Sequence, residues 1–240
     1  MRFFNTAGPV NSNDHYTLSP LKRFDLEDIE LLIDQKKYFI LHAPRQTGKT
    51  TSLNALADHL NKKSVYASVY INVEPAQAAR ENVEQAMRAI LSRLASQIKW
   101  LFNDSFFQEN WESVLNSSGP FAAFVEMVAQ WCEHMEKPVV LLIDEIDSLV
   151  GDTLISILRQ IREGYNNRPA RFPSSIILCG VRDIRDYRIH SDMEKSIITG
   201  GSAFNIKAKS LRLGGFTENE TAELMVQHEQ ETGQKFTANA

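Results

Sequence analysis

The sequence predicts an α/β fold in which helices cover both faces of a parallel sheet. Strand-like and helix-like segments alternate along most of the 240 residues, as in folds built from β-α-β units. Two strand-like segments, 139–143 and 174–179, are apolar without interruption, which is typical of strands buried on both faces. A loop between the first strand and the next helix has the spacing of a phosphate-binding loop.

Composition and charge exclude several classes of protein. An apolar content of 43% is ample for a core, and a formal net charge of −4 does not indicate a general polyanion binder. The two cysteines, Cys132 and Cys179, have no metal or redox spacing and predict reduced, buried thiols of a cytoplasmic protein. We find no signal-peptide core and no apolar run near the ~20 residues that span a bilayer, so no membrane association is expected.

The N-terminal segment, residues 1–25, is rich in turn-forming residues but too apolar for a disordered tail. We expect it to pack on the core, and two interpretations stay open: it lies near the nucleotide, or it simply wraps the surface. Asp25 predicts the cap of a short helix whose apolar side chains, Ile29, Leu32 and Ile33, face inward.

The remaining elements follow in order. Segments 37–42, 65–73, 138–143, 174–179 and 210–213 predict five strands, the last of them a short edge strand. Segments 49–61, 79–101, 121–135 and 152–165 predict helices, and 106–115 is a short apolar insert around Trp111. The stretch from Arg182 to Lys195 is charged and breaks at Gly200-Gly201.

The alternation of strand-like and helix-like segments ends at Gly214-Gly215. The sequence from Thr217 to Glu220 is a capping box, which predicts a helix to about Thr232 that stops at Gly233. The expected organisation is therefore a core domain at 1–214 that carries the phosphate-binding loop, with 1–36 packed on it, and the beginning of a truncated helical lid at 215–240.

The proposed phosphate loop follows the pattern G-x-x-x-x-G-K-[ST], with alanine at the first glycine. Backbone N–H groups of such a loop, and the positive end of the next helix, converge where a phosphate binds. The predicted nucleotide-binding residues of the loop are Ala43, Pro44, Arg45, Gln46, Thr47, Gly48, Lys49, Thr50 and Thr51. Ala43 would cost on the order of 1 kcal/mol if its φ angle had to be positive, so it should not abolish binding.

The acidic pair Asp144-Glu145 ends the buried strand at 138–143 and supplies the second signal. Asp144, with the Thr50 hydroxyl, is a predicted Mg²⁺ ligand, and Lys49 can reach the β- and γ-phosphates. Glu145 can orient or deprotonate a water that attacks the γ-phosphate. The alternative for the pair, a solvated helix cap, is disfavoured by its place after five apolar residues.

Arginines near the predicted site form a third group. If strand 174–179 lies between the loop strand and the acidic strand, Arg182 faces the γ-phosphate and can stabilise its charge. Its alternative is a salt bridge to Asp183 or Asp186. Arg45, Arg185 and Arg188 are weaker candidates for contacts with phosphate or a neighbouring subunit; a solvated charged face is the alternative for the last two.

The two motifs A-P-R-Q-T-G-K-T and V-V-L-L-I-D-E-I-D resemble the AAA+/STAND branch of P-loop ATPases. Further segments are similar to a widespread bacterial group of AAA-type ATP-binding proteins: Phe4 to Pro9, His15-Tyr16, Tyr38-Phe39 and Ala203 to Ile206. The resemblance covers nearly the whole chain. It implies a three-layer P-loop NTPase fold, with strand order 5-1-4-3-2 and an ATP site between core and lid.

The same resemblance implies the site. It places Lys49 and Thr50 on phosphate and Mg²⁺, Asp144 on Mg²⁺ and Glu145 on the attacking water. Arg182 resembles the arginine that STAND proteins carry after the fourth strand. Members usually continue into a helical lid and further modules, and little of the lid follows here.

We therefore expect a Mg²⁺-dependent ATPase whose hydrolysis drives a conformational switch. Adenine is preferred because no N-K-x-D element for guanine is present. One alternative is a nucleotide-binding regulatory or interaction module with negligible hydrolysis; another is a DNA-associated ATPase, disfavoured by the charge balance. Partners could be a second copy of the chain or C-terminal effector modules.

Overall fold

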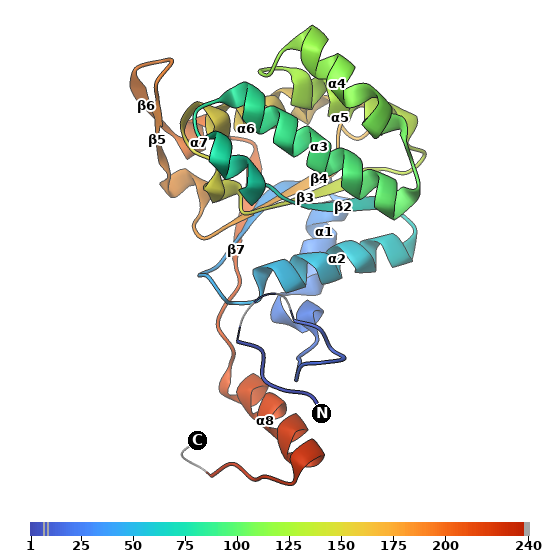
Figure 1. Cartoon of the computed structure of the whole chain (residues 1–240), viewed down its shortest axis with the longest axis vertical. Coiled ribbons are helices and arrows are strands. Elements are labelled where there is room, and N and C mark those ends of the chain that lie inside the picture. Colours follow the sequence, from blue (N-terminus) through green and yellow to red (C-terminus); the bar gives the residue numbers. More distant parts are fainter. Residues whose placement is uncertain (7, 9, 238–240) are drawn as a thin grey trace.

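The computed structural model describes residues 1–6, 8 and 10–237, and its main feature is a five-stranded parallel sheet with helices on both faces (Figure 1). The strand order is β2-β3-β4-β1-β7. Counted along the chain, these are the five predicted strands in the predicted order 5-1-4-3-2, which is confirmed. The strands are β1 (Tyr38–His42), β2 (Ala67–Asn72), β3 (Val139–Asp144), β4 (Ser175–Gly180) and β7 (Lys207–Arg212).

Two hydrophobic clusters, one on each face of the sheet, form the core. On one face lie α1 (Leu26–Asp34) and α2 (Lys49–Lys63), which pack on side chains such as Phe39 and Leu142. On the other face lie α3 (Val83–Phe102), α4 (Phe106–Ser118), α5 (Ala123–His134) and α6 (Gly151–Gly164). Alternate residues of each strand point to the two clusters, so all strands but β7 are nearly fully buried.

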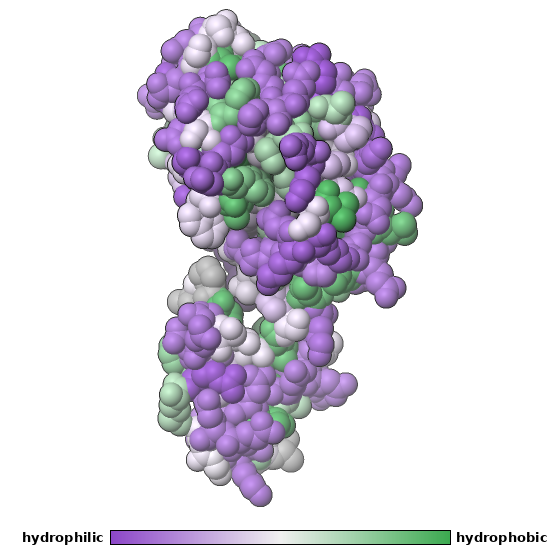
Figure 2. All heavy atoms as spheres, turned by 90° about the vertical axis from the view of Figure 1, so that its right-hand side faces the viewer, coloured by the Kyte–Doolittle hydropathy of each residue, from purple (hydrophilic) through white to green (hydrophobic). Residues whose placement is uncertain are grey.

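The C-terminal helix α8 (Glu218–Thr232) lies outside this sandwich, beside the N-terminal segment (Figure 1). No residue of α8 is buried. In the space-filling view a larger part and a smaller part are joined by a narrow waist (Figure 2). Before α8, residues 214–217 have no regular structure, and Thr217 and Glu220 make the predicted capping box.

The N-terminal segment is divided between the two parts. Its early residues, among them Arg2 and Tyr16, bond to α8, whereas Leu21 and Phe24 pack against the cluster under α1 and α2. The helix predicted after Asp25 is α1, and the Asp25 side chain accepts from the Asp28 amide as expected of a cap. Among the described residues, no helix is both long enough and apolar enough to cross a membrane.

Three segments differ from the sequence-based expectation. The helix predicted from 79 begins at Val83, because residues Glu74–Ala79 form a short 3-10 helix and Asn82 caps α3 through the Gln85 amide. The apolar insert around Trp111 is the helix α4. The charged stretch contains an antiparallel hairpin of β5 (Arg188–Ser191) and β6 (Ser196–Thr199).

The glycine pair Gly200-Gly201 was expected to interrupt the charged stretch. Instead, Gly200 begins the short helix α7 (Gly200–Ala203). The Thr199 side chain caps this helix by accepting from the Ser202 amide. A Cβ at Gly200 would lie 1.9 Å from the Ile184 carbonyl oxygen. Glycine is therefore needed here because the backbone packs closely, not because a helix or strand ends.

Candidate active site

The loop from Ala43 to Gly48 joins β1 to α2 at the carboxyl edge of the sheet. Ala43 is fully buried, and its amide donates to the Gly180 carbonyl of β4 at 3.1 Å. Its φ angle is not positive, so the cost considered for alanine does not arise; positive φ angles occur at Gln46 (61°) and Gly48 (84°). Gly48 occupies the left-handed region that favours glycine, at the N-cap of α2.

Lys49 opens α2 and is only 5% exposed. Its Nζ atom donates to the Ala43 carbonyl at 3.1 Å and lies 3.9 Å from Oε1 of Glu145. Thr47 closes the loop by donating from Oγ1 to the Pro44 carbonyl at 2.8 Å. The ammonium group is thus held between the loop and the acidic pair, where it can move to a bound phosphate.

Asp144 ends β3 and is completely buried. Its Oδ2 atom accepts hydrogen bonds from Thr50 Oγ1 at 2.7 Å and from the Tyr70 hydroxyl at 3.0 Å. Its Oδ1 atom accepts from the Glu145 amide at 2.9 Å. Three donors therefore satisfy this buried carboxylate and fix its orientation.

Tyr70 is a site residue that sequence reasoning missed. It lies on β2, the neighbour of β3, and is 9% exposed. Burial, and next the charge of Asp144, raise the pKa of its hydroxyl, so Tyr70 stays a hydrogen-bond donor. The sequence carries no local signal for it, because the pairing of β2 with β3 brings it to Asp144.

Glu145 follows Asp144 in a left-handed conformation, with φ at 57°. Such a conformation costs on the order of 1 kcal/mol for a residue with a side chain, and strained residues of this kind cluster at active sites. Burial raises the pKa of Glu145, and the nearby charges of Asp144, Asp147 and Glu74 raise it further, while Lys49 lowers it. A carboxylate with a raised pKa is a stronger general base.

The donor set suits Mg²⁺. The Thr50 hydroxyl and the Asp144 carboxylate are hard oxygen ligands placed side by side, and Mg²⁺ commonly takes one or two such groups together with waters and phosphate oxygens. Within the described residues no group of three or more His, Cys, Asp or Glu side chains could hold a metal. The arrangement therefore fits a metal that arrives with a phosphate ligand.

The segment after β4 carries the predicted Arg182. β4 lies between β1 and β3, so its carboxyl end lies between the loop and the acidic pair. The Arg182 side chain is exposed, as is that of Arg45. Asp183, its suggested partner, bonds to Lys207 Nζ at 2.6 and 2.8 Å. The side chains of Arg185 and Arg188, like residues 7, 9 and 238–240, lie outside the described part of the chain.

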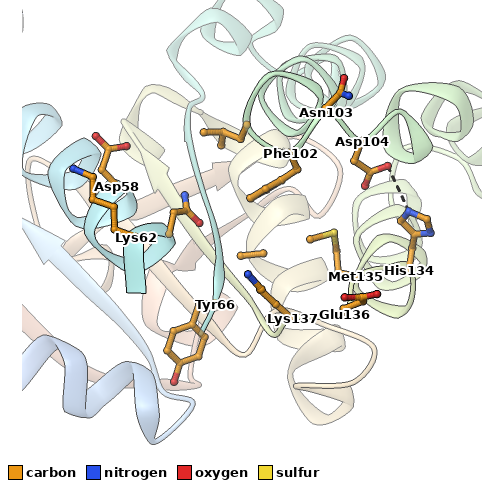
Figure 3. Close-up of a pocket in the computed structure, with 13 residues that line it drawn as sticks. Asp58, Lys62, Tyr66, Phe102, Asn103, Asp104, His134, Met135, Glu136 and Lys137 are labelled. Carbon is orange, nitrogen blue, oxygen red and sulfur yellow. Dashed lines mark ion pairs between the residues drawn. The ribbon is translucent and has the colours of Figure 1, made fainter. Parts of the chain in front are cut away.

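Two cavities lie away from the loop. One of about 780 Å³ opens at the amino edge of the sheet, between the ends of α2, α3 and α5, where Asp58, Lys62, Phe102 and His134 line it (Figure 3). Another of about 480 Å³ is lined by residues after β2 and on α3, among them Glu74. Neither is lined by the phosphate loop, and the candidate site rests instead on the contacts that join the loop to Asp144 and Glu145.

Comparison with known proteins gives one family match and several similar folds. A family described as "AAA domain" matches residues 33–187, and no curated protein sequence matches the chain. A Walker-type ATPase of Pyrococcus abyssi is 15% identical with a TM-score of 0.58, over 98% of this chain and 64% of that one.

Two further structures have similar folds. Cdc6p from Pyrobaculum aerophilum is 17% identical with a TM-score of 0.51, over 86% of this chain and 48% of its own. A DNA replication initiation factor is 15% identical with a TM-score of 0.50, over 93% and 55%. Identities this low show a shared fold alone. The chain spans less than two thirds of the length of each of these three proteins.

Proposed function

The chain belongs to the AAA domain family of P-loop ATPases, and on that basis we propose that it hydrolyses ATP with Glu145 as general base and Mg²⁺ as cofactor. One observation carries the proposal: the hydrogen bond of 2.7 Å between Thr50 and Asp144 joins the phosphate loop to the acidic pair. The buried Lys49 lies between the same two parts.

Each residue has a role in binding or in the reaction. Backbone amides of the loop, from Arg45 to Thr51, surround the phosphates of ATP, and Lys49 neutralises the β- and γ-phosphates. Glu145 accepts a proton from water as the water oxygen bonds to the γ-phosphorus. The bond from that phosphorus to the β,γ-bridging oxygen breaks, which gives ADP and phosphate.

Mg²⁺ held by Thr50 and Asp144 would neutralise charge on the phosphate oxygens. Tyr70 keeps the Asp144 carboxylate in place through the hydrogen bond to Oδ2. Arg182, exposed after β4, would stabilise the charge that develops on the γ-phosphate. The Cys132 and Cys179 thiols, whose pKa values burial raises, take no part.

We expect α8 to switch between two positions, one with ATP bound and one after hydrolysis. Helix α8 has no buried residue and is joined to β7 by the exposed Gly214-Gly215 pair, so its movement relative to the sheet does not expose a buried face of α8. This switch would act on further modules or a second copy of the chain, in the cytoplasm. Membership of the STAND branch stays a prediction.

The test is phosphate release by the wild-type protein and by Glu145→Gln. Loss of the base should lower kcat by about 10²-fold or more, whereas ATP affinity should change little. Glu109→Gln, an exposed glutamate of α4, is the matched control and should keep full activity. Equal turnover in Glu145→Gln and wild type would rule out Glu145 as the base.

Binding is measured separately by thermal unfolding with ATP, ADP and GTP in the presence of Mg²⁺. A ligand at one hundred times its Kd stabilises the folded state by about 2.7 kcal/mol. ATP and ADP should raise the unfolding temperature and GTP should not. Clear stabilisation by ATP without Glu145-dependent turnover would favour the nucleotide-binding module that hydrolyses negligibly.

A further inference from the structure

Arg23 has a largely covered side chain that the proposed reaction leaves without a role. It ends the short 3-10 helix Pro20–Arg23, and its side chain is only 6% exposed. Burial lowers the pKa of its guanidinium, an effect that the Glu220 charge partly offsets. Its neighbours Leu21 and Phe24 pack on the core cluster under α1 and α2, which fixes the backbone of Arg23 to the core.

On one side, Arg23 holds the linker to α8. Its Nη2 atom donates to the Gly214 carbonyl at 2.6 Å, and its Cζ atom lies 4.1 Å from the centroid of the Phe216 ring. Its Nε atom lies 3.8 Å from Oε1 of Glu220. Glu220 also accepts from the Thr217 amide in the capping box, so Arg23 reaches the first turn of the helix.

On the other side, Arg23 lies against the phosphate loop. Its Nη1 atom is 3.9 Å from the position that a Cβ of Gly48 would occupy. Gly48 is the N-cap of α2, where the helix dipole and free amides favour a phosphate. One guanidinium therefore bonds to the linker and lies close to the end of the phosphate loop.

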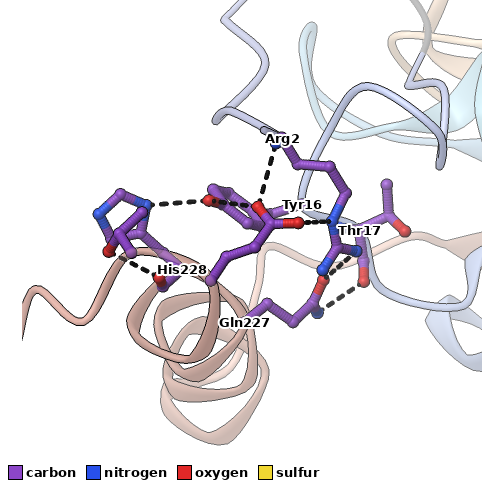
Figure 4. A network of polar contacts seen from close by, with 7 residues as sticks. Arg2, Tyr16, Thr17, Gln227 and His228 are labelled. Atoms are coloured by element: carbon purple, nitrogen blue, oxygen red, sulfur yellow. Dashed lines mark hydrogen bonds and ion pairs between the residues drawn. The ribbon is translucent and has the colours of Figure 1, made fainter.

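Other contacts hold α8 to the N-terminal segment rather than to the sheet. Arg2, Tyr16 and Thr17 face Gln227 and His228 of the helix (Figure 4). The Glu231 carboxylate accepts from Arg2 and Tyr16. This N-terminal segment touches α2 through the Val10 amide, which donates to Thr51 Oγ1 at 3.3 Å.

We propose that Arg23 couples the phosphate loop to α8. Without nucleotide, its guanidinium holds the linker and the first turn of α8 against the loop. When the phosphates of ATP bind, the guanidinium turns toward them, because a guanidinium pairs more strongly with phosphate than with a carbonyl, a ring face or a carboxylate at 3.8 Å. The linker is then released and α8 moves. The nucleotide-dependent half of this proposal rests on the proposed ATP binding.

The experiment measures the distance between spin labels on Asp58→Cys of α2 and Glu223→Cys of α8. Both positions are exposed, and the native Cys132 and Cys179 are buried, so labelling is selective. Distance distributions are recorded with and without Mg²⁺-ATP. The comparison covers the labelled wild type, Arg23→Gln and the control Arg171→Gln, whose exposed side chain pairs with Glu133.

In the wild type and the control, the distribution should be narrow without nucleotide and should shift when ATP binds. In Arg23→Gln it should be broad without nucleotide, and the ATP-dependent shift should be lost while ATP still binds. If Arg23 had only a structural role, Arg23→Gln would change the stability of the protein, but the ATP-dependent shift would remain. Phe216→Leu, at a half-exposed position, weakens the same contact from the linker side and should also broaden the distribution.

Three results contradict the proposal, and a fourth tests the proposed function on which it partly rests. An unchanged nucleotide-free distribution in both variants overturns the proposal, and so does an ATP-dependent shift that persists in Arg23→Gln. A wild type that binds ATP without any shift also contradicts it. A wild type that binds no ATP refutes the proposed function, and the nucleotide-free comparison then decides alone whether Arg23 holds α8.

Discussion

At the scale of single residues, the two neighbouring acids of the site differ sharply. Asp144 is fully buried and accepts from three donors, which suits a fixed ligand. Glu145 is partly exposed, its backbone is strained and its carboxyl has a raised pKa. These properties suit a group that exchanges a proton. Adjacent positions in one motif therefore supply two different chemistries.

The first prediction concerns the pKa of Glu145. A raised pKa means that the carboxyl stays protonated to higher pH, so the base form is lost as pH falls through a value above that of ordinary glutamate. The acidic limb of kcat/KM against pH should therefore lie above that ordinary value. Because Lys49 lowers the pKa, Lys49→Met should raise it further, as measured by ¹³C NMR titration of the carboxyl.

The control for this titration is Glu109, which is exposed and far from the site in the sequence. Its ¹³C resonance should not differ between wild type and Lys49→Met. A Glu145 that titrates as an ordinary glutamate, or that does not respond to Lys49→Met, contradicts the burial and charge argument.

Residue-scale features could be predicted from the sequence only where they belong to a local motif. Lys49, Thr50, Asp144 and Glu145 stand in short patterns whose chemistry depends on spacing along the chain. Tyr70 and Arg23 carry no such pattern. Tyr70 meets Asp144 through strand pairing, and Arg23 meets Gly48 and Gly214 through the folding of three separate segments.

At the scale of elements, the end of α6 depends on the absence of a side chain. A Cβ at Gly164 would lie 2.5 Å from atoms of the Phe172 ring, which is completely buried. Gly164→Ala should therefore displace the ring or the helix end and destabilise the protein by about 1–3 kcal/mol. Urea unfolding measures the difference in the free energy of unfolding.

Gly215→Ala is the matched control. A Cβ at Gly215 would meet nothing within 4 Å, and its φ angle does not require glycine. Its free energy of unfolding should stay within about 0.5 kcal/mol of the wild type. Similar unfolding midpoints for the two variants would show that the Phe172 ring can move aside without lowering the free energy of unfolding.

Elements were predictable where apolar periodicity alone decides them. The strands and the long helices of the sandwich follow this rule. The β5–β6 hairpin was missed because its polar, charged sequence lacks alternation and Asp152 of α6 holds it through the Ser191 hydroxyl and the Met193 amide. The short helix α7 was missed because glycines at its start normally disfavour helix, and here close packing outweighs that preference.

At the scale of the whole molecule, α8 depends on the opposite end of the chain. Glu231→Ala removes the acceptor for Arg2 and Tyr16, so α8 should lose part of its attachment to the N-terminal segment. Hydrogen exchange should become faster across residues 218–232, because local opening no longer has to break these bonds. Exchange in the sheet should not change.

Glu223→Ala is the control on the same helix, at an exposed position. It tests whether removing a negative charge from α8 is enough to speed exchange. If both variants exchange alike, the contacts with the N-terminal segment do not stabilise the helix. Mass spectrometry of the deuterated peptides separates these cases.

The order of the strands could be predicted because few arrangements of a parallel sheet are allowed, and the family resemblance selects one. The pairing of the N-terminal segment with α8 could not. It depends on polar contacts between opposite ends of the chain, and polar residues in loops leave their partners open. The sequence therefore predicts the sandwich better than the smaller part beside it.

The position of β1 also has a consequence for synthesis of the protein. Phe39 of β1 pairs with Ile177 of β4 and Lys209 of β7, so both neighbours of the strand are translated long after it. Closing such long loops is slow, and the ribosome delivers the N-terminal part first. The sheet around the phosphate loop that β1 carries should therefore be completed only after β7 has been translated. A nascent chain that ends before β7 would expose the edge of β1 and give cellular chaperones a surface to bind.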